Sequence, residues 1–154
     1  MSDSEFGGDP KTRVSVSGWV IYFQGVAISW SSKAQRSVTL SSTEAEYMAL
    51  SEVAKEIIFA KHVLDSMGIK VKLPIVINVD NTGAMFLGMN RMIGQRTKHI
   101  DIRAHFVREY IQDDILKLVF VRTKENSADI FTKNVTGDIY HALVVTMISE
   151  KESI

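Results

Sequence analysis

The sequence is most informative at Ser41-Ser42-Thr43-Glu44-Ala45-Glu46-Tyr47-Met48-Ala49-Leu50, where an amphipathic helix begins. Ser41 and Glu44 match the capping box, in which a serine hydroxyl and a glutamate three residues later satisfy backbone groups at a helix start. Apolar residues then recur every three or four positions as far as Leu64, and Gly68 is well placed to end the helix. The stretch predicts one long helix with one face against a core.

Glu46 lies on that apolar face, in line with Leu50, Val53, Ile57, Ala60 and Leu64. A buried carboxylate is costly unless something compensates its charge, and the helix N-terminus supplies only about 0.3–1 kcal/mol. A divalent cation would compensate it fully. Glu44 points about 200° away around the helix, and its capping role explains it without chemistry. We therefore assign Glu46 to a site, while the alternative is a half-exposed acid at the rim of the core.

Strand patterns flank the helix on both sides. Ser17–Phe23 and Val26–Trp30 alternate in the manner of strands, and Gln24-Gly25 between them predicts a hairpin. After the helix, the apolar runs Ile75–Val79 and Leu116–Val121 predict buried strands. Further helices are expected at Thr82–Met89, at Thr97–Gln112 and after Asn126 or Ser127. Strands that first pair locally and are then separated by helices predict an α/β (α+β mixed) fold with a mixed sheet.

Three other acids fall where such a sheet could bring them to Glu46. Asp3 is in the polar start of the chain, Asp80 closes a predicted buried strand, and Asp129 is in the first turn of the last predicted helix. Each has an ordinary explanation alone: surface solvation for Asp3, a turn or cap for Asp80, and a favourable helix start for Asp129. Together they match a two-metal site, because two Mg²⁺ ions about 3.5–4 Å apart need several shared carboxylates.

A basic segment accompanies these acids although the formal net charge of the chain is zero. Between residues 91 and 108 there are two histidines and a single acid, Asp101, among five Lys and Arg residues: Arg91, Arg96, Lys98, Arg103 and Arg108. A basic segment beside an acidic cluster suits a polyanionic ligand that is held at one patch and cut at another. The alternative is a solvated helix face.

The remaining composition excludes other classes of protein. A length of 154 residues suits one domain, and the lack of cysteine excludes disulfides and thiolate metal sites and favours a reducing compartment. The N-terminus has no secretory pattern and no apolar run is as long as a membrane span, so we expect no membrane partner. The four histidines show no metal-ligand spacing, and no P-loop, dinucleotide fingerprint or nucleophile elbow is present.

Seven ordered blocks of this sequence resemble the ribonuclease H domain of Ty1/copia-type retrotransposon Pol polyproteins. The resemblance runs from about Ser2 to Lys133, so it covers nearly the whole chain. It rests on residues 2–9 (SDSEFGGD), 28–33 (ISWSSK), 41–50 (SSTEAEYMAL), 79–81 (VDN), 96–101 (RTKHID), 105–109 (HFVRE) and 128–133 (ADIFTK).

The resemblance implies a fold, an activity and a ligand set. The fold is RNase H-like, with a five-stranded mixed sheet, three strands antiparallel and then two parallel, flanked by helices. The activity is Mg²⁺-dependent endonucleolytic cleavage of the RNA strand of RNA–DNA hybrids, with two ions and with Mn²⁺ as a substitute. The metal-binding and catalytic acids fall on Asp3, Glu46, Asp80 and Asp129. The segment that would hold backbone phosphates supplies Arg96, Lys98, His99, Arg103 and Arg108.

The resemblance also implies a setting. The partners would be the hybrid and the reverse transcriptase domain of a parent polyprotein, and the location would be intracellular, in the cytoplasm within a virus-like particle or in the nucleus. Residues 1–133 would form the RNase H-like domain, and residues 134–154 a C-terminal extension of it, helical or frayed. The sequence leaves the oligomeric state open.

The sequence departs from the family pattern at two places. Only Met1 and Ser2 precede Asp3, although Asp3 should lie inside a central strand, so we expect a chain severed from a longer polyprotein. The loop from Arg122 to Ser127 lacks the histidine that relatives often place there. Two alternatives stay open: an inactive remnant that binds nucleic acid or only folds, and a nuclease of the same fold that cuts DNA duplexes or junctions.

Overall fold

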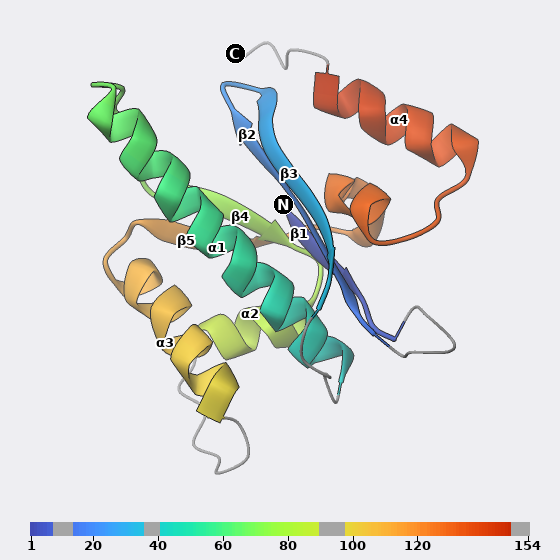
Figure 1. Ribbon diagram of the computed structural model, residues 1–154, viewed down its shortest axis with the longest axis horizontal. Helices are drawn as coiled ribbons and strands as arrows, with labels where there is room; N and C mark the ends of the chain where they lie inside the picture. The colour runs from blue at the N-terminus through green and yellow to red at the C-terminus, as the bar shows by residue number, and fades with distance from the viewer. Residues whose placement is uncertain (8–13, 36–40, 90–97, 149–154) are drawn as a thin grey trace.

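The computed structural model describes residues 1–7, 14–35, 41–89 and 98–148, in which three strands come first and two further strands follow among the helices (Figure 1). In chain order they are β1 (Ser2–Glu5), β2 (Val16–Phe23), β3 (Val26–Ala34), α1 (Ser42–Ser66), β4 (Ile75–Val79), α2 (Thr82–Met89), α3 (Lys98–Gln112), β5 (Leu116–Phe120), the 3₁₀ helices η1 (Thr123–Glu125) and η2 (Ser127–Phe131), and α4 (Gly137–Ile148). The prediction of a mixed α/β chain is confirmed.

The strands form two sheets. β1, β2 and β3 form an antiparallel sheet in that order, and β4 pairs with β5 in parallel. The five strands therefore have the predicted directions, but the prediction of one five-stranded sheet is not confirmed. β1 has four residues and is paired along its length with β2. It also lies near β4, but the described strands form no ladder between β1 and β4.

The local patterns of the sequence account for most of the boundaries. Gln24 and Gly25 both have positive φ, 49° and 83°, as a two-residue turn matched to the twist of a hairpin requires. Ser41 caps α1 by accepting a hydrogen bond from the Glu44 amide (3.1 Å), and Gly68 follows the helix with φ of 78°. The predicted helix from Ser41 to about Met67 is confirmed.

Helix α1 is the element around which the rest packs. It contacts β1 and β2 on one side and α2 and α3 on another, while η2 and α4 lie by the β2–β3 hairpin (Figure 1). Its buried side chains form the core together with those of both sheets and of α3; the largest fully buried members are Tyr47, Leu50, Val53, Ile77, Val79, Val107 and Leu116. The first turns of α1 are thereby held against β1, where the site forms.

A cavity of about 220 Å³ separates β2 from β4 beyond the start of β1. Met1 stands at its end, where its backbone exchanges hydrogen bonds with Val20 (2.8 and 3.1 Å). Beyond Met1, the cavity is lined by Ile21–Phe23 of β2 and by Ile75 and Val76 of β4. Burial lowers the pKa of the Met1 ammonium to about 5. The Met1 ammonium is thus largely shielded from solvent, although the residue as a whole is only half-buried.

The C-terminal part differs in detail from the predictions. The last predicted helix is a 3₁₀ helix, η2, with Asn126 as its cap. Gly137–Ile148 form α4, a helix within the predicted C-terminal extension, and it contacts η2 and β3. Within the described ranges, no helix combines the length and apolar character needed to span a bilayer.

Candidate metal centre

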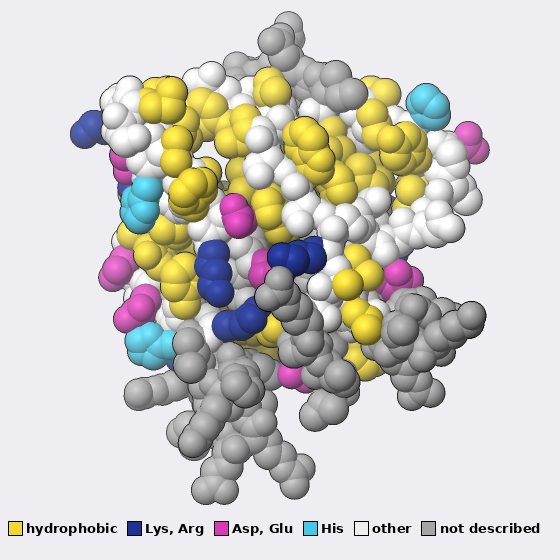
Figure 2. Space-filling view, in the orientation of Figure 1, with side chains coloured by type: hydrophobic (Ala, Val, Ile, Leu, Met, Phe, Trp, Pro, Cys, Tyr) yellow, Lys and Arg dark blue, Asp and Glu magenta, His cyan; other side chains and the backbone are white. Residues whose placement is uncertain are grey.

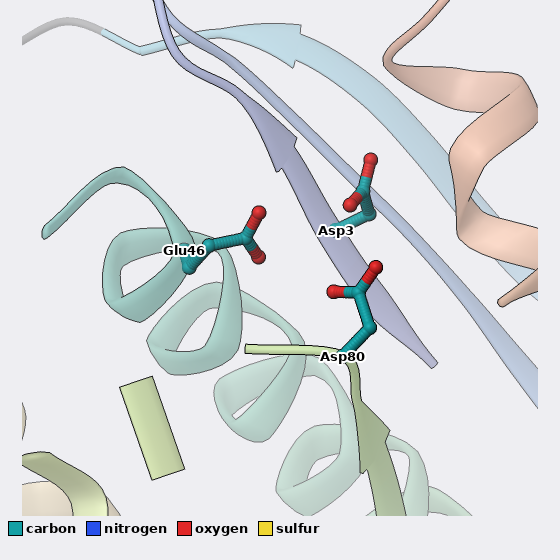
Figure 3. A group of neighbouring side chains, drawn as sticks. All are labelled: Asp3, Glu46 and Asp80. Atoms are coloured by element: carbon teal, nitrogen blue, oxygen red, sulfur yellow. The ribbon is translucent and has the colours of Figure 1, made fainter. Parts of the chain in front are cut away.

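Three carboxylates from three separate segments meet at one point. Asp3 comes from the middle of β1, Glu46 from the first turns of α1, and Asp80 directly follows β4. One oxygen of each lies within 4.8 Å of one oxygen of each of the others. Figure 3 shows the three side chains directed toward a common space. Residues 43 and 34 positions apart in the chain are therefore brought together by the fold.

Local hydrogen bonds fix each of the three positions. Asp3 is paired with Gly18 in the β1–β2 ladder. The amide of Ser4 donates to Glu46 Oε1 (3.1 Å), which ties α1 to β1 at the site. After Asp80, Asn81 caps α2 by accepting from the Ala84 amide (2.9 Å), so the chain turns away at the strand end and leaves the Asp80 carboxylate at the edge.

Burial dominates the electrostatics of the pair Asp3 and Glu46. The exposed fractions of these residues are 1% and 7%. Burial, together with the charges of Asp3 and Asp80, raises the pKa of Glu46 to about 8 against the hydrogen bond from Ser4. Burial likewise raises the pKa of Asp3 to about 6, although a hydrogen bond from Thr132 favours its ionised form. Both acids are costly to ionise in the protein alone.

The donor set fits a divalent metal ion. Glu46 Oε2 is buried and has no hydrogen-bond partner among the described residues, although buried polar atoms are normally satisfied. It belongs to the carboxylate that converges on Asp3 and Asp80. Carboxylate oxygens are the ligands of hard cations such as Mg²⁺ and Mn²⁺. A cation bound there would compensate the negative charges of all three carboxylates, which the trio itself cannot neutralise.

Asp129 lies on the other side of Asp3 and is not in the trio. Lys133, four residues later, stands between the two acids, with its Nζ 3.0 Å from Asp129 Oδ1 and 3.4 Å from both oxygens of Asp3. Asp129 is close enough for its charge to raise the pKa of Asp3. The four predicted acids thus lie in one region. Asp3, Glu46 and Asp80 converge directly, and Asp129 is linked to Asp3 by the Lys133 ammonium, which contacts both.

Residues that the sequence analysis did not assign hold η2 in this position. Asn126, fully buried, donates to the carbonyl of Ser2 (2.8 Å) and accepts from the Ala128 amide (3.2 Å). Thr132 donates a short hydrogen bond to Asp3. Thr132 and Lys133 belong to the quoted block 128–133, but nothing in the local pattern shows that they reach a residue some 130 positions earlier.

Gly18 of β2 lets η2 approach the sheet, and its replacement tests that contact. A methyl group at Gly18 would come within 2.6 Å of Thr132 Cγ2 and 2.8 Å of Phe131 Cβ. Because overpacked substitutions destabilise a fold, we expect Gly18→Ala to lower the free energy of unfolding by about 1–3 kcal/mol. Urea titration of the wild type and the variant measures this difference. The control is Gly137→Ala, whose new methyl group meets nothing within 4 Å. Equal stabilities for both variants would contradict the close packing of η2.

The predicted nucleic-acid residues are only partly within the described structure. Arg96 lies outside the described residues, and so do the side chains of Lys98 and His99. Arg103 Nη1 is 3.5 Å from Ser51 Oγ of α1, and Arg108 is half-buried, near enough to Tyr47 for its charge to act on the tyrosine. Figure 2 shows Lys and Arg side chains close to acidic ones near the middle of this face.

Comparison with known proteins yields several relatives, of which three align over most of this chain. The chain is 44% identical over 132 residues to the retrovirus-related Pol polyprotein from transposon TNT 1-94 of Nicotiana tabacum. It is 40% and 39% identical over 132 residues to the corresponding polyproteins from transposons RE1 and RE2 of Arabidopsis thaliana. Each alignment covers 86% of this chain.

The chain spans about a tenth of the length of these relatives, 9–10%. No family model matches the sequence, and no solved structure matches it. Identity near 40% over nearly the whole chain nonetheless establishes common descent. The chain is thus related to the Ty1/copia-type, retrovirus-related Pol polyproteins of plant transposons.

Proposed function

We propose that this chain is the ribonuclease H part of a retrotransposon Pol polyprotein and cleaves the RNA strand of RNA–DNA hybrids with divalent metal ions. The observation that carries the proposal is the convergence of Asp3, Glu46 and Asp80, with a buried Glu46 oxygen that has no partner among the described residues. The relationship to Pol polyproteins supports it, because those relatives align over 86% of the chain and the blocks that resemble a ribonuclease H run from about Ser2 to Lys133.

The roles of the chain's own residues follow from their placement. Asp3, Glu46 and Asp80 would hold one ion, and Asp3 and Asp129, which both contact Lys133, would hold a second. When bound, Mg²⁺ supplies a Lewis acid that activates the attacking water and stabilises charge on the leaving 3′-oxygen. The acids themselves provide geometry and charge neutralisation. Because the 3′-oxygen is the leaving group, cleavage would leave a 3′-hydroxyl and a 5′-phosphate.

The substrate would be held from the side of α3. Arg103 lies on this helix, which packs against the α1 turns that follow Glu46, and the basic residues before it are expected to contribute from the same segment of the chain. Such cations contact backbone phosphates without reading sequence, and 2′-hydroxyl groups distinguish the RNA strand. The proposal therefore expects activity that depends on hybrid shape and falls with rising salt concentration.

A labelled RNA–DNA hybrid in Mg²⁺ tests the proposal. The wild-type chain should cut the RNA strand, and Asp80→Asn should slow cutting by about 1,000-fold or more, since losing a metal ligand removes several kcal/mol of transition-state stabilisation. Asp138→Asn, at an exposed position in the first turn of α4, is the matched control and should cut like the wild type.

The other outcomes separate the alternatives. Cutting that persists in Asp80→Asn would refute the metal-site assignment. Binding of the hybrid without cutting by the wild type would favour the inactive remnant. Cutting of duplex or branched DNA in preference to the hybrid would favour a different nuclease on the same fold.

A further inference from the structure

Among the ion pairs of the described residues, the one that includes a member of the carboxylate trio is formed by Lys133, whose ammonium group contacts Asp3. Its Nζ contacts both oxygens of Asp3 at 3.4 Å and Asp129 Oδ1 at 3.0 Å. Its side chain is 35% exposed, whereas those of Asp3 and Asp129 are 1% and 14% exposed. The lysine thus reaches inward from the surface and places a positive charge between two buried or nearly buried acids.

Asp3 is shared by two groups of acids with different counterions. Toward Glu46 and Asp80 it faces two further carboxylates, and Glu46 Oε2 has no hydrogen-bond partner among the described residues. Toward Asp129 it faces the Lys133 ammonium, and Thr132 donates a hydrogen bond to the same carboxylate. The carboxylates of Asp3, Glu46 and Asp80 therefore need a bound cation to compensate their charge, whereas between Asp3 and Asp129 the Lys133 ammonium already supplies one.

We infer that Lys133 is a built-in cation at the Asp3–Asp129 position, so that the free protein takes up one divalent ion readily and a second only when the lysine withdraws. The inference rests on the proposed metal site but concerns a residue to which that function gives no role. Two cations cannot occupy the same few ångströms between Asp3 and Asp129, because like charges at such distances repel strongly in a partly buried site.

The geometry of the side chain allows the withdrawal. A lysine carries its charge on a flexible four-carbon stem with three rotatable donors, and the stem of Lys133 reaches solvent. A phosphate group of a bound nucleic acid would offer the ammonium an alternative partner outside the site. Lys133 acts on the reaction through Asp3 and Asp129, and is in this sense a positioning residue.

Counting bound Mn²⁺ by electron paramagnetic resonance, without nucleic acid, tests the inference. The wild type should bind one ion tightly and a second weakly. In Lys133→Met the second ion should bind at least about tenfold more tightly, because its competitor has gone. Lys133→Arg keeps the charge and should behave like the wild type. Lys124→Met removes the same charge from an exposed position in η1 and should change neither ion.

The outcomes distinguish this inference from the proposed function. Two ions of similar affinity in the wild type, unchanged in Lys133→Met, would overturn the role of Lys133 and leave the metal site standing. No bound ion in either protein would overturn the metal site and this inference together. Failure to cut a hybrid would not bear on the result, since no nucleic acid is present. Thermal unfolding in EDTA checks that each variant is folded, and Lys133→Gln provides a second neutral variant if the methionine is not tolerated.

Discussion

Glu46→Gln is expected to make the metal-free protein more stable while it removes hybrid cleavage. The wild-type carboxyl group is 7% exposed and has a pKa of about 8 in the fold, against an ordinary value of 4.5. An uncharged amide of the same shape avoids the cost of holding an acid in this position. The same change removes a ligand of the proposed ion, so cleavage should fall by about 1,000-fold or more.

The sign of the pH dependence follows from the direction of the shift. Since the folded protein binds the Glu46 proton more tightly than the unfolded chain does, its stability falls as pH rises from the unfolded pKa of 4.5 to the folded pKa of about 8. Within that window the loss is about 1.4 kcal/mol per pH unit for one group. Asp3, with a pKa raised to about 6, adds a second loss between 3.8 and about 6.

Thermal unfolding in EDTA at pH 5, 7 and 8.5 measures the effect. Glu46→Gln should be close to the wild type near pH 5 and exceed it by about 4 kcal/mol at pH 8 and above, which is roughly 8–16 °C for a chain of this size. Added Mg²⁺ should stabilise the wild type and have a smaller effect on the variant, since only the wild type keeps the full ligand set.

Glu44→Gln is the matched control, because it makes the same chemical change two residues earlier in the same helical turn. Glu44 is half-buried at the helix cap and lies outside the carboxylate trio. It should give no gain in stability at high pH and no loss of cleavage. A Glu46→Gln protein that is less stable than the wild type at pH 8 in EDTA would show that ionising the Glu46 carboxyl group does not destabilise the fold.

The features predicted correctly from the sequence are those that local patterns determine. Ser41 and Gly68 fix the ends of α1 through capping chemistry that needs no distant partner. The burial of Glu46 followed from its place on a helical stripe. Asp80 was placed correctly at the strand end because an apolar run stops there. In each case a few neighbouring residues carry the information.

The features that the sequence did not reveal depend on contacts between distant segments. Lys133 acquires its role only because Asn126 and Gly18 hold η2 against β1 and β2. The half-buried position of Arg108 beside Tyr47 likewise depends on how α3 packs against α1. Periodicity reports which face of an element is buried, but it does not report which residue of another element meets that face.

The separation of the sheets is the largest departure from the sequence-based expectation, and it leads to the second prediction. Beyond Met1 the strands β2 and β4 line the two sides of the 220 Å³ cavity instead of pairing with a strand between them. Met1 and Val20 exchange both backbone hydrogen bonds. The alternation of an antiparallel ladder then puts the amide of Tyr22, two residues on, at the same edge.

A chain extended ahead of Met1 by four residues, Val-Ile-Val-Thr, is expected to unfold at a temperature roughly 6–12 °C higher, a gain of about 3 kcal/mol. Each added apolar side chain contributes about 1.5–3 kcal/mol when buried, against about 1–2 kcal/mol for ordering each residue. The extension also replaces the buried ammonium, whose pKa is lowered from 8.0 to about 5, by a neutral peptide group.

The ammonium adds a pH signature of its own. A base with a lowered pKa loses its proton more easily in the folded state, so the Met1 ammonium by itself contributes a loss of stability as pH falls from 8.0 to about 5, opposite in sign to the contribution of Glu46. The extended chain should lose this acid sensitivity, because its terminal amine lies beyond the cavity. Hydrogen exchange should show new protection at the Tyr22 amide, which would then face a strand partner.

A Gly-Ser-Gly-Ser extension of equal length separates the two causes. It moves the ammonium out of the interior but brings no apolar side chain to the cavity, so it should remove the acid sensitivity and give only a small part of the rise in melting temperature. If both extensions raised the melting temperature equally and left the Tyr22 amide unprotected, the space between β2 and β4 would not accept a strand. If the apolar extension alone also increased hybrid cleavage, the length of β1 would be what limits the precision with which Asp3 is held against Glu46 and Asp80.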